Sequence, residues 1–381
     1  MGKNRVADLV TKVLAEAGIR RIYGVPGDSL NGITDSIRQR KDIQWIHVRH
    51  EETAAFVAGA EDHLTGSLAV CAGSCGPGNL HLINGLYDCQ RSRVPVVASA
   101  AQIPSTELGS SYFQETRPEH LFAQCSHYCE LVSNVEQMPR VLEIAMQTAI
   151  SKRGVSVIAI PGDIAMKEAV VDHPRVHYHE PSPTVCPSEE ELKVLANLLN
   201  RSKKITIFGG AGCAGAHAEL IEFAGKLQAP ILHAYRGKEF IEYDNPFDVG
   251  MTGLLGFSSG YFAMMDCDVL VMLGTDFPYQ PFYPKDATTV QIDLRGEQIG
   301  RRTKVDFGFV GDIKEHAPGL AAKAAAKFIR DAFEGMCCAL SLDAQEFRRL
   351  GDRTSRSKAH SPAICHAPAR STRIRRCHFH V

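Results

Sequence analysis

The chain has 381 residues, of which 44% are hydrophobic and 22% charged, and this is enough apolar material for two α/β domains. The 42 basic and 43 acidic residues leave a formal net charge of −1, which argues against a nucleic-acid partner. No apolar run reaches membrane-spanning length, and the first helical pattern lacks the apolar core of a signal peptide. The 12 cysteines are scattered rather than grouped, which predicts a cytoplasmic protein with reduced thiols.

Short apolar segments alternate with helical patterns through the first 170 residues. We expect six strands, at residues 20–25, 43–48, 67–72, 95–100, 128–132 and 155–160. Helical patterns include residues 5–17, 52–65 and 80–91. This alternation predicts a parallel sheet with helices on both faces, in which 43–48 and 67–72 are buried strands.

A stretch with four prolines and three histidines, residues 171–187, interrupts the alternation and is expected to be a linker. Further strands are expected at residues 204–208, 230–234, 269–273, 289–293 and 305–310, with a helix at 214–227. The sequence therefore predicts a second doubly wound parallel-sheet domain. We place the two domains at residues 1–175 and 188–334, followed by a tail at 335–381.

The segment from Arg49 to Asn79 carries the clearest chemical pattern. Glu51 and the glycine-rich turn Gly73–Asn79 both lie where a predicted strand gives way to a helix, the edge at which open α/β sheets bind ligands. A carboxylate withdrawn from water there can hold or pass a proton near neutral pH. Alternatively, Glu51 is only a favourable acidic residue in a first helical turn, and Gly-Pro-Gly only a tight connection.

Five motifs in this order resemble the thiamine-diphosphate-dependent pyruvate oxidase and acetolactate synthase group, and most closely the quinone-dependent pyruvate dehydrogenases, also called pyruvate oxidases. They are Tyr23–Asp28, Arg49–Glu52, Gly73–Asn79, Asn84–Leu86 and Tyr112–Glu115. The resemblance extends over residues 6–333. It implies that Glu51 hydrogen-bonds the aminopyrimidine ring of thiamine diphosphate and favours its imino tautomer.

The same resemblance assigns further residues of the first domain. Phe113 and Gln114 match positions that line the substrate pocket of the oxidases, and Gly27, Gly76 and Asn79 match the surface that binds the pyrimidine. Pyruvate is the implied substrate and quinone the implied electron acceptor. Intact members of the family are tetramers, so a homo-oligomer is expected.

In the second domain, the turn Gly209–Gly215 follows a strand and opens a helix, which allows backbone amides to approach a phosphate. Such a turn alone is weak evidence for a nucleotide. Together with the segments around it, the turn matches the FAD-binding positions of the oxidases. These are Gly210, Gly212, Arg236, Met251, Thr252, Gly253, Gly274, Thr275, Asp276, Phe277, Pro278 and Asp293. Asp293, at a strand end, can accept hydrogen bonds from ribose hydroxyls.

The chain departs from the family in one respect. Members carry a third domain whose Gly-Asp-Gly motif holds Mg²⁺ and the diphosphate. The four Gly-Asp pairs here, at Gly27, Gly162, Gly311 and Gly351, are not followed by glycine. We therefore expect half of a thiamine diphosphate site, no metal ligands, no C-terminal membrane-binding segment and no activity of this chain alone.

The tail has a composition of its own. Residues 353–381 hold seven Arg or Lys, no Asp or Glu and no apolar period. A nucleic-acid or membrane arm is one interpretation. However, back-translation of residues 358–369 with a one-nucleotide shift permits a sequence that resembles the start of the third domain, which predicts an out-of-frame, disordered tail.

Two classes of function follow from these observations. The first is a truncated enzyme subunit that resembles pyruvate oxidase, or a fragment of an acetolactate-synthase-like enzyme. The second is a catalytically inert flavin-binding or interaction protein. The sequence leaves open the 2-oxo acid and the choice between quinone and oxygen.

Overall fold

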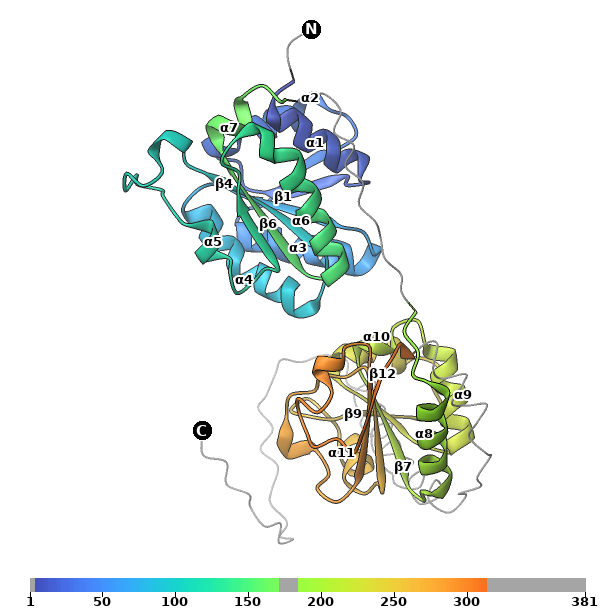
Figure 1. Ribbon diagram of the computed structural model, residues 1–381. Helices are drawn as coiled ribbons and strands as arrows, with labels where there is room; N and C mark the ends of the chain where they lie inside the picture. The colour runs from blue at the N-terminus through green and yellow to red at the C-terminus, as the bar shows by residue number, and fades with distance from the viewer. Residues whose placement is uncertain (1–3, 171–183, 314–381) are drawn as a thin grey trace, which may run out of the picture. The chain divides into compact units, whose positions relative to one another are not determined.

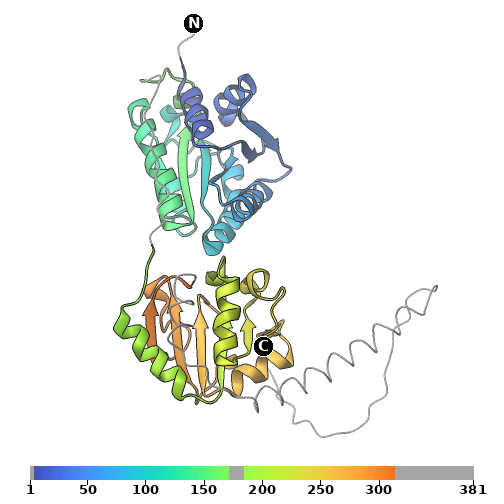
Figure 2. The ribbon, with the colours of Figure 1, turned by 90° about the vertical axis from the view of Figure 1, so that its right-hand side faces the viewer.

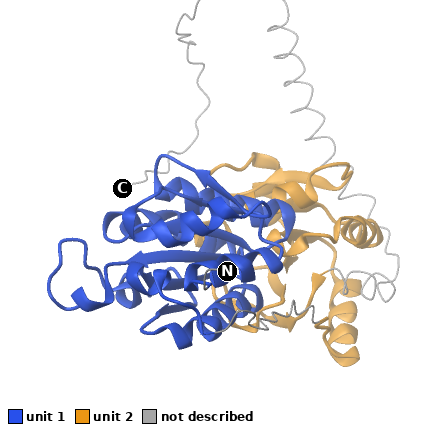
Figure 3. Cartoon of the chain, turned by 90° about the horizontal axis from the view of Figure 1, so that it is seen from above, with its two compact units in different colours: residues 1–182 blue, residues 183–381 orange. Residues whose placement is uncertain are grey.

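The structure is a computed structural model that describes residues 4–170 and 184–313. The chain divides into two compact units, residues 1–182 and 183–381 (Figure 3). Each unit contains a six-stranded parallel sheet, with helices on both faces (Figures 1 and 2). The predicted fold class is therefore confirmed. The domain limits 1–175 and 188–334 stay predictions, and the tail at 335–381 lies outside the described residues.

The sheet of the first unit has the strand order β2-β1-β3-β4-β6-β5. Its strands are β1 Arg21–Gly24, β2 Gln44–His47, β3 Ala69–Gly73, β4 Val96–Gln102, β5 Tyr128–Leu131 and β6 Val155–Pro161, and every pairing is parallel. The helices are α1 Val6–Glu16, α2 Asn31–Gln39, α3 Glu51–Thr65, α4 Pro77–Ser92, α5 Pro118–Leu121, α6 Met138–Lys152 and α7 Gly162–Met166. Each predicted strand of this unit is present, with ends shifted by one or two residues.

Side-chain alternation along β3 divides the core of this unit into two layers. Val70 and Ala72 pack with residues of α1, α2 and α6, whereas Ala69 and Cys71 pack with residues of α3 and α4. The prediction that 43–48 is a buried strand was wrong. β2 is an edge strand whose first and last residues are exposed, because only β1 pairs with it.

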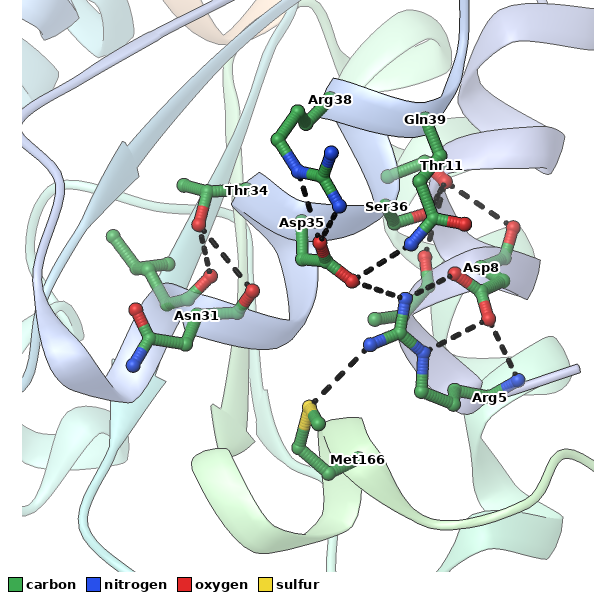
Figure 4. A network of polar contacts seen from close by, with 12 residues as sticks. Arg5, Asp8, Thr11, Asn31, Thr34, Asp35, Ser36, Arg38, Gln39 and Met166 are labelled. Atoms are coloured by element: carbon green, nitrogen blue, oxygen red, sulfur yellow. Dashed lines mark hydrogen bonds and ion pairs between the residues drawn. The ribbon is translucent and has the colours of Figure 1, made fainter.

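A network of ion pairs joins α1 to α2 (Figure 4). The guanidinium of Arg5 lies 2.9 Å from Asp8 on its own helix and 2.9 Å from Asp35 on α2. Arg38 contacts the same Asp35 carboxylate at 2.7 Å, and Arg5 Nη1 also approaches Met166 Sδ at 3.9 Å. These partly exposed pairs fix the relative positions of the two helices more than they stabilise the fold.

The sheet of the second unit has the order β12-β11-β10-β7-β8-β9 and is also entirely parallel. Its strands are β7 Ile205–Gly209, β8 Ile231–His233, β9 Asp248–Met251, β10 Val269–Leu273, β11 Thr288–Asp293 and β12 Phe307–Val310. The helices are α8 Glu189–Arg201, α9 His217–Leu227, α10 Lys238–Ile241 and α11 Ser258–Met265. A capping box starts α8: Ser188 Oγ accepts from the Glu191 amide, and the Glu191 carboxylate accepts from the Ser188 amide.

Strand β9 is absent from the sequence prediction. It is a short edge strand that includes Gly250, and only one of its four residues, Val249, is fully buried. Such a segment lacks the apolar run that identifies β10, whose five residues are all buried and whose limits match the prediction. Within residues 4–170 and 184–313, none of the helices has the length and apolarity needed to span a bilayer.

Helices α3 and α4 approach each other through small residues. A methyl group at Gly85 of α4 would lie 2.6 Å from Ala55 Cβ and 2.8 Å from the Glu52 carbonyl oxygen of α3. A methyl group at Gly59 of α3 would lie 2.7 Å from Cys89 Sγ of α4. Both helices therefore depend on glycine at the contact, and this close packing sets the distance between their first turns.

We predict that Gly85→Ala destabilises the first unit by about 1–3 kcal/mol, because the added methyl overpacks the contact between α3 and α4. The matched control is Gly32→Ala in α2. Its methyl would lie 3.1 Å from the sulfur of the half-exposed Met166 side chain, which can move, and 3.3 Å from Ala7 Cβ. Both substitutions gain about 1 kcal/mol of helix propensity, so the milder contacts should leave Gly32→Ala closer to neutral than Gly85→Ala.

The measurement is urea unfolding followed by fluorescence of the single tryptophan, Trp45, which lies in β2 and reports on the first unit. Equal unfolding free energies for the two variants would show that the glycine contact is not required.

Candidate functional site

The chain reverses direction across the first sheet next to β1. From β1 it passes to β2 on one side and then crosses to β3 on the other, so the loops that follow β1 and β3 border a crevice at the carboxyl edge. These loops touch. A methyl group at Gly27 would lie 2.6 Å from Ser74 Cβ, and the Cys75 amide donates to Ser29 Oγ at 3.0 Å.

Glu51 is the first residue of α3 and is only 6% exposed. A Cβ atom added at Gly78 would lie 3.0 Å from Glu51 Oε1, and Glu51 Oε2 lies 3.1 Å from His81 Nδ1. The first turns of α4 therefore supply both the space and a polar partner for the buried carboxylate. Glu52, by contrast, is half-buried and contacts His50 and Asn84.

The glycine turn has a conformation that side chains disfavour. Gly76 caps α4 with φ 68° and ψ −117°, and Pro77 follows at the first helical position. Asn79 is completely buried: its Nδ2 donates to the Ala101 carbonyl at 2.7 Å, but its Oδ1 has no hydrogen-bond partner among the described residues. A buried acceptor of this kind fits a ligand that donates a hydrogen bond.

The structure brings Gln114 to this turn but leaves Phe113 in solvent. A Gly76 Cβ would lie 3.0 Å from Gln114 Cβ, and Cys75 Sγ lies 3.4 Å from Gln114 Oε1. Phe113 is 80% exposed, with its ring 4.9 Å from that of Tyr112. Only Gln114 of this pair is therefore placed beside the glycine turn within the unit.

Two residues at this site were not identified from the sequence. Ser74 packs between Gly27 and Gly78, and His81 lies one helical turn beyond Gly78 on the side of Glu51. The three-residue spacing from Gly78 was the available signal for His81. Ligand atoms of His50, Glu51 and His81 lie within 4.8 Å of one another, the one such group among the residues that the structure describes. Its hydrogen bond and ring stacking account for this proximity.

The second sheet has the same kind of reversal, between β7 and β10. The loops after these strands meet in backbone contact: the Gly212 amide donates to the Gly274 carbonyl at 3.0 Å. A methyl group at Gly210 would lie 2.5 Å from Gly274 O and 2.6 Å from Thr275 Cα. Because only glycine permits this approach, main-chain atoms line the place where the two loops meet.

The predicted flavin residues gather at this carboxyl edge. Gly210 and Gly212 follow β7, Arg236 follows β8, Met251, Thr252 and Gly253 end β9 and follow it, Gly274, Thr275, Asp276, Phe277 and Pro278 follow β10, and Asp293 ends β11. The hydroxyls of Thr252 and Thr275 are buried with no hydrogen-bond partner among the described residues. Such hydroxyls fit a polar ligand in the crevice.

Two carboxylates of this edge are already engaged. Asp293 accepts from the Arg295 amide at 2.9 Å, and burial raises the pKa of its carboxyl. Asp276 pairs with Arg302 at 2.7 Å.

A buried histidine and aspartate lie side by side in the same unit. His233, at the end of β8, has its Nε2 3.5 Å from Asp248 Oδ1 at the start of β9, and 3.5 Å from Glu242. Burial raises the pKa of Asp248 to about 7, with the charge of Glu242 adding to the effect, and burial lowers the pKa of His233. Both groups are therefore driven toward their neutral forms. This pair was not predicted, because β9 was not expected from the sequence.

Comparison with known proteins identifies both units. Residues 4–121 match the thiamine pyrophosphate enzyme N-terminal TPP binding domain, and residues 192–320 match the thiamine pyrophosphate enzyme central domain. The chain belongs to the thiamine pyrophosphate enzyme family. This confirms the resemblance at the level of the family, whose members among the relatives include pyruvate oxidase and acetolactate synthases.

Three relatives illustrate the similarity. An uncharacterized 42.6 kDa protein of Pseudomonas amyloderamosa is 59% identical over 91% of this chain and 87% of its own. The putative thiamine pyrophosphate-containing protein YdaP of Bacillus subtilis is 38% identical, over 82% of this chain and 54% of its own. The pyruvate oxidase of Lactiplantibacillus plantarum is 29% identical, over 82% of this chain and 53% of its own. The chain thus spans about half the length of the last two.

We predict that Asp248→Asn flattens the pH dependence of the stability of the second unit. The folded-state pKa of Asp248 is raised from 3.8 to about 7, so its contribution to stability is full below pH 4 and is lost as the pH rises to 7. The pKa change corresponds to about 4 kcal/mol, and solvent near this 14%-exposed side chain reduces the expected loss to about 2 kcal/mol.

The measurement is the free energy of unfolding of the second unit between pH 4 and 8, by circular dichroism. The transition of this unit is the one during which Trp45 fluorescence stays unchanged, since Trp45 lies in the first unit. Burial lowers the pKa of His233, so this residue reduces the stability of the second unit as the pH falls below 6.5. Asp286→Asn, at an exposed position, is the control. Parallel curves for wild type and Asp248→Asn would contradict the prediction.

Proposed function

We propose that the chain supplies the pyrimidine-binding half of a thiamine diphosphate site and a flavin-binding domain, within an enzyme that oxidises pyruvate. The observation that carries the proposal is the buried Glu51 carboxylate, held against a glycine turn at the reversal point of the first sheet. It lies in the part of the chain that matches the TPP binding domain.

The residues of the first site fit an aminopyrimidine ring. Glu51 would exchange a proton or a hydrogen bond with a ring nitrogen, since it is a carboxylate withdrawn from water. The unpartnered Asn79 Oδ1 would accept from the amino group, and Gly27 and Gly76 would leave space against the main chain. Bound thiamine diphosphate supplies the nucleophilic carbon and electron sink that decarboxylation of a 2-oxo acid requires. Gln114, beside the turn, would face the substrate, and Phe113 would join it only through a neighbouring chain or domain.

The carboxyl edge of the second sheet fits FAD. Gly210 and Gly212 would leave space for phosphate beside the main chain, and Thr252, Thr275 and Asp293 would bond polar groups of the nucleotide. Similarity to a pyruvate oxidase supports pyruvate as the substrate, with quinone as the proposed acceptor. Acetolactate synthases are also relatives, and they support acetolactate formation as the second candidate function.

We predict that the purified chain binds FAD and that Thr275→Val weakens binding about tenfold. The substitution keeps the shape of the side chain but removes a hydroxyl that would bond the nucleotide, a change of about 1.4 kcal/mol. Thr288→Val, at the amino end of β11 and away from the crevice, should bind as the wild type does. Quenching of flavin fluorescence measures both affinities. A chain that does not bind FAD, or equal affinities for the two variants, would argue against the flavin site.

We predict that Glu51→Gln lowers pyruvate oxidation by about 10²- to 10⁴-fold in a fusion of this chain to the remaining half of the Bacillus subtilis relative. Glu52→Gln should have little effect, because the next residue of a helix points about 100° away. Bound flavin checks that each fusion is folded. Pyruvate-dependent quinone reduction measures pyruvate oxidation. Production of acetolactate without quinone reduction would favour acetolactate formation as the function. Equal losses for both variants would withdraw the role of Glu51.

A further inference from the structure

The Glu51 carboxylate has a polar neighbour that plays no part in the proposed function. His81 Nδ1 lies 3.1 Å from Glu51 Oε2, whereas Oε1 is on the side of Gly78. His81 and Gly78 are three residues apart on α4 and therefore share one face of the helix. The two oxygens of one buried carboxylate thus meet two different environments.

The ring of His81 is itself held in place. It stacks on the ring of His50, with centroids 4.3 Å apart and an interplanar angle of 26°. His50 caps α3, and its Nδ1 accepts from the Glu52 amide at 3.3 Å. The residue that starts the helix of Glu51 therefore also supports the face of the imidazole that contacts Glu51.

We propose that His81 is a positioning residue for Glu51: it donates Nδ1–H to Oε2, fixes the plane of the carboxylate and leaves Oε1 for the aminopyrimidine ring. This inference rests on the proposed function, since it assumes that Glu51 faces the cofactor. A hydrogen bond at one oxygen removes rotation of the carboxylate about its last bond, which would otherwise interchange the two oxygens.

The proposal requires a particular tautomer. A carboxylate oxygen accepts, so the hydrogen of a neutral His81 must reside on Nδ1, with the lone pair on Nε2. The His81 side chain is 46% exposed, which leaves it accessible to solvent. The Nδ1–H form therefore gives a spectroscopic signature of the contact with Glu51 that a packing role alone would not produce.

The first measurement is the ¹⁵N spectrum of histidine side chains in the full chain, with the His81 signals assigned by their loss in His81→Asn. We expect the Nδ1–H form in the wild type and its loss in Glu51→Ala. Glu61→Ala is the matched control, because Glu61 lies on the same helix but pairs with Arg21. An Nε2–H form in the wild type, or no change in Glu51→Ala, would overturn the proposal.

The second measurement is the affinity for thiamine diphosphate with Mg²⁺, by calorimetry, for the fusion of this chain to the remaining half of the Bacillus subtilis relative, in the wild-type form and in two variants of His81. His81→Asn keeps a donor close to the position of Nδ1 and should bind within about twofold of the wild type. His81→Ala removes the donor and should bind about tenfold more weakly. Trp45 fluorescence confirms that both variants are folded. Equal binding by the alanine variant and the wild type would overturn the positioning role.

The two measurements separate failure of this inference from failure of the proposed function. If the wild type shows the Nδ1–H form but the wild-type fusion does not bind thiamine diphosphate, the cofactor site fails, and His81 is then only a structural partner of Glu51. If the wild type binds thiamine diphosphate but shows the Nε2–H form, the cofactor site stands and the role of His81 is withdrawn.

Discussion

Both candidate sites depend on the same constraint. At particular glycines, the main chain lies closer to a neighbouring main chain or short side chain than a Cβ atom at that position would permit. In the first unit, Gly78 makes room for Ser74 and for the Glu51 carboxylate. In the second, Gly210 and Gly212 lie against the loop that follows β10. Parallel strands place the loops that follow them at one edge of the sheet, and each reversal of strand order brings two of these loops together. Glycine sets how closely the two loops can approach each other.

The buried polar atoms at the two carboxyl edges differ in whether they have hydrogen-bond partners. Glu51 is buried but has a partner in His81, whereas Asn79 Oδ1 and the hydroxyls of Thr252 and Thr275 are buried with none among the described residues. A buried polar atom left unpaired costs about 1–3 kcal/mol. The fold tolerates this at the carboxyl edges, where a ligand would supply the missing hydrogen bonds.

The sequence predicted the features that depend on local pattern and missed those that depend on tertiary position. Apolar runs identified β10, and the glycine turn with Glu51 indicated the first candidate site, because both are contiguous along the chain. The edge positions of β2 and β9 could not be read from composition, since exposure there depends on which strands lie beside them. Of the site residues, Gln114 reaches the glycine turn within the unit while the adjacent Phe113 does not.

The two reversal points differ in the chemistry that they present, although their topology is similar. The first places a buried carboxylate, backed by two stacked imidazoles, beside a glycine turn, which suits a ring nitrogen whose protonation has to be controlled. The second presents glycine main chain, two hydroxyls without partners among the described residues and a carboxylate whose pKa is raised by burial, which suits the polar groups of a nucleotide. Under the proposed function, the same arrangement of strands would serve two kinds of ligand, and the residues at its carboxyl edge would determine which one fits.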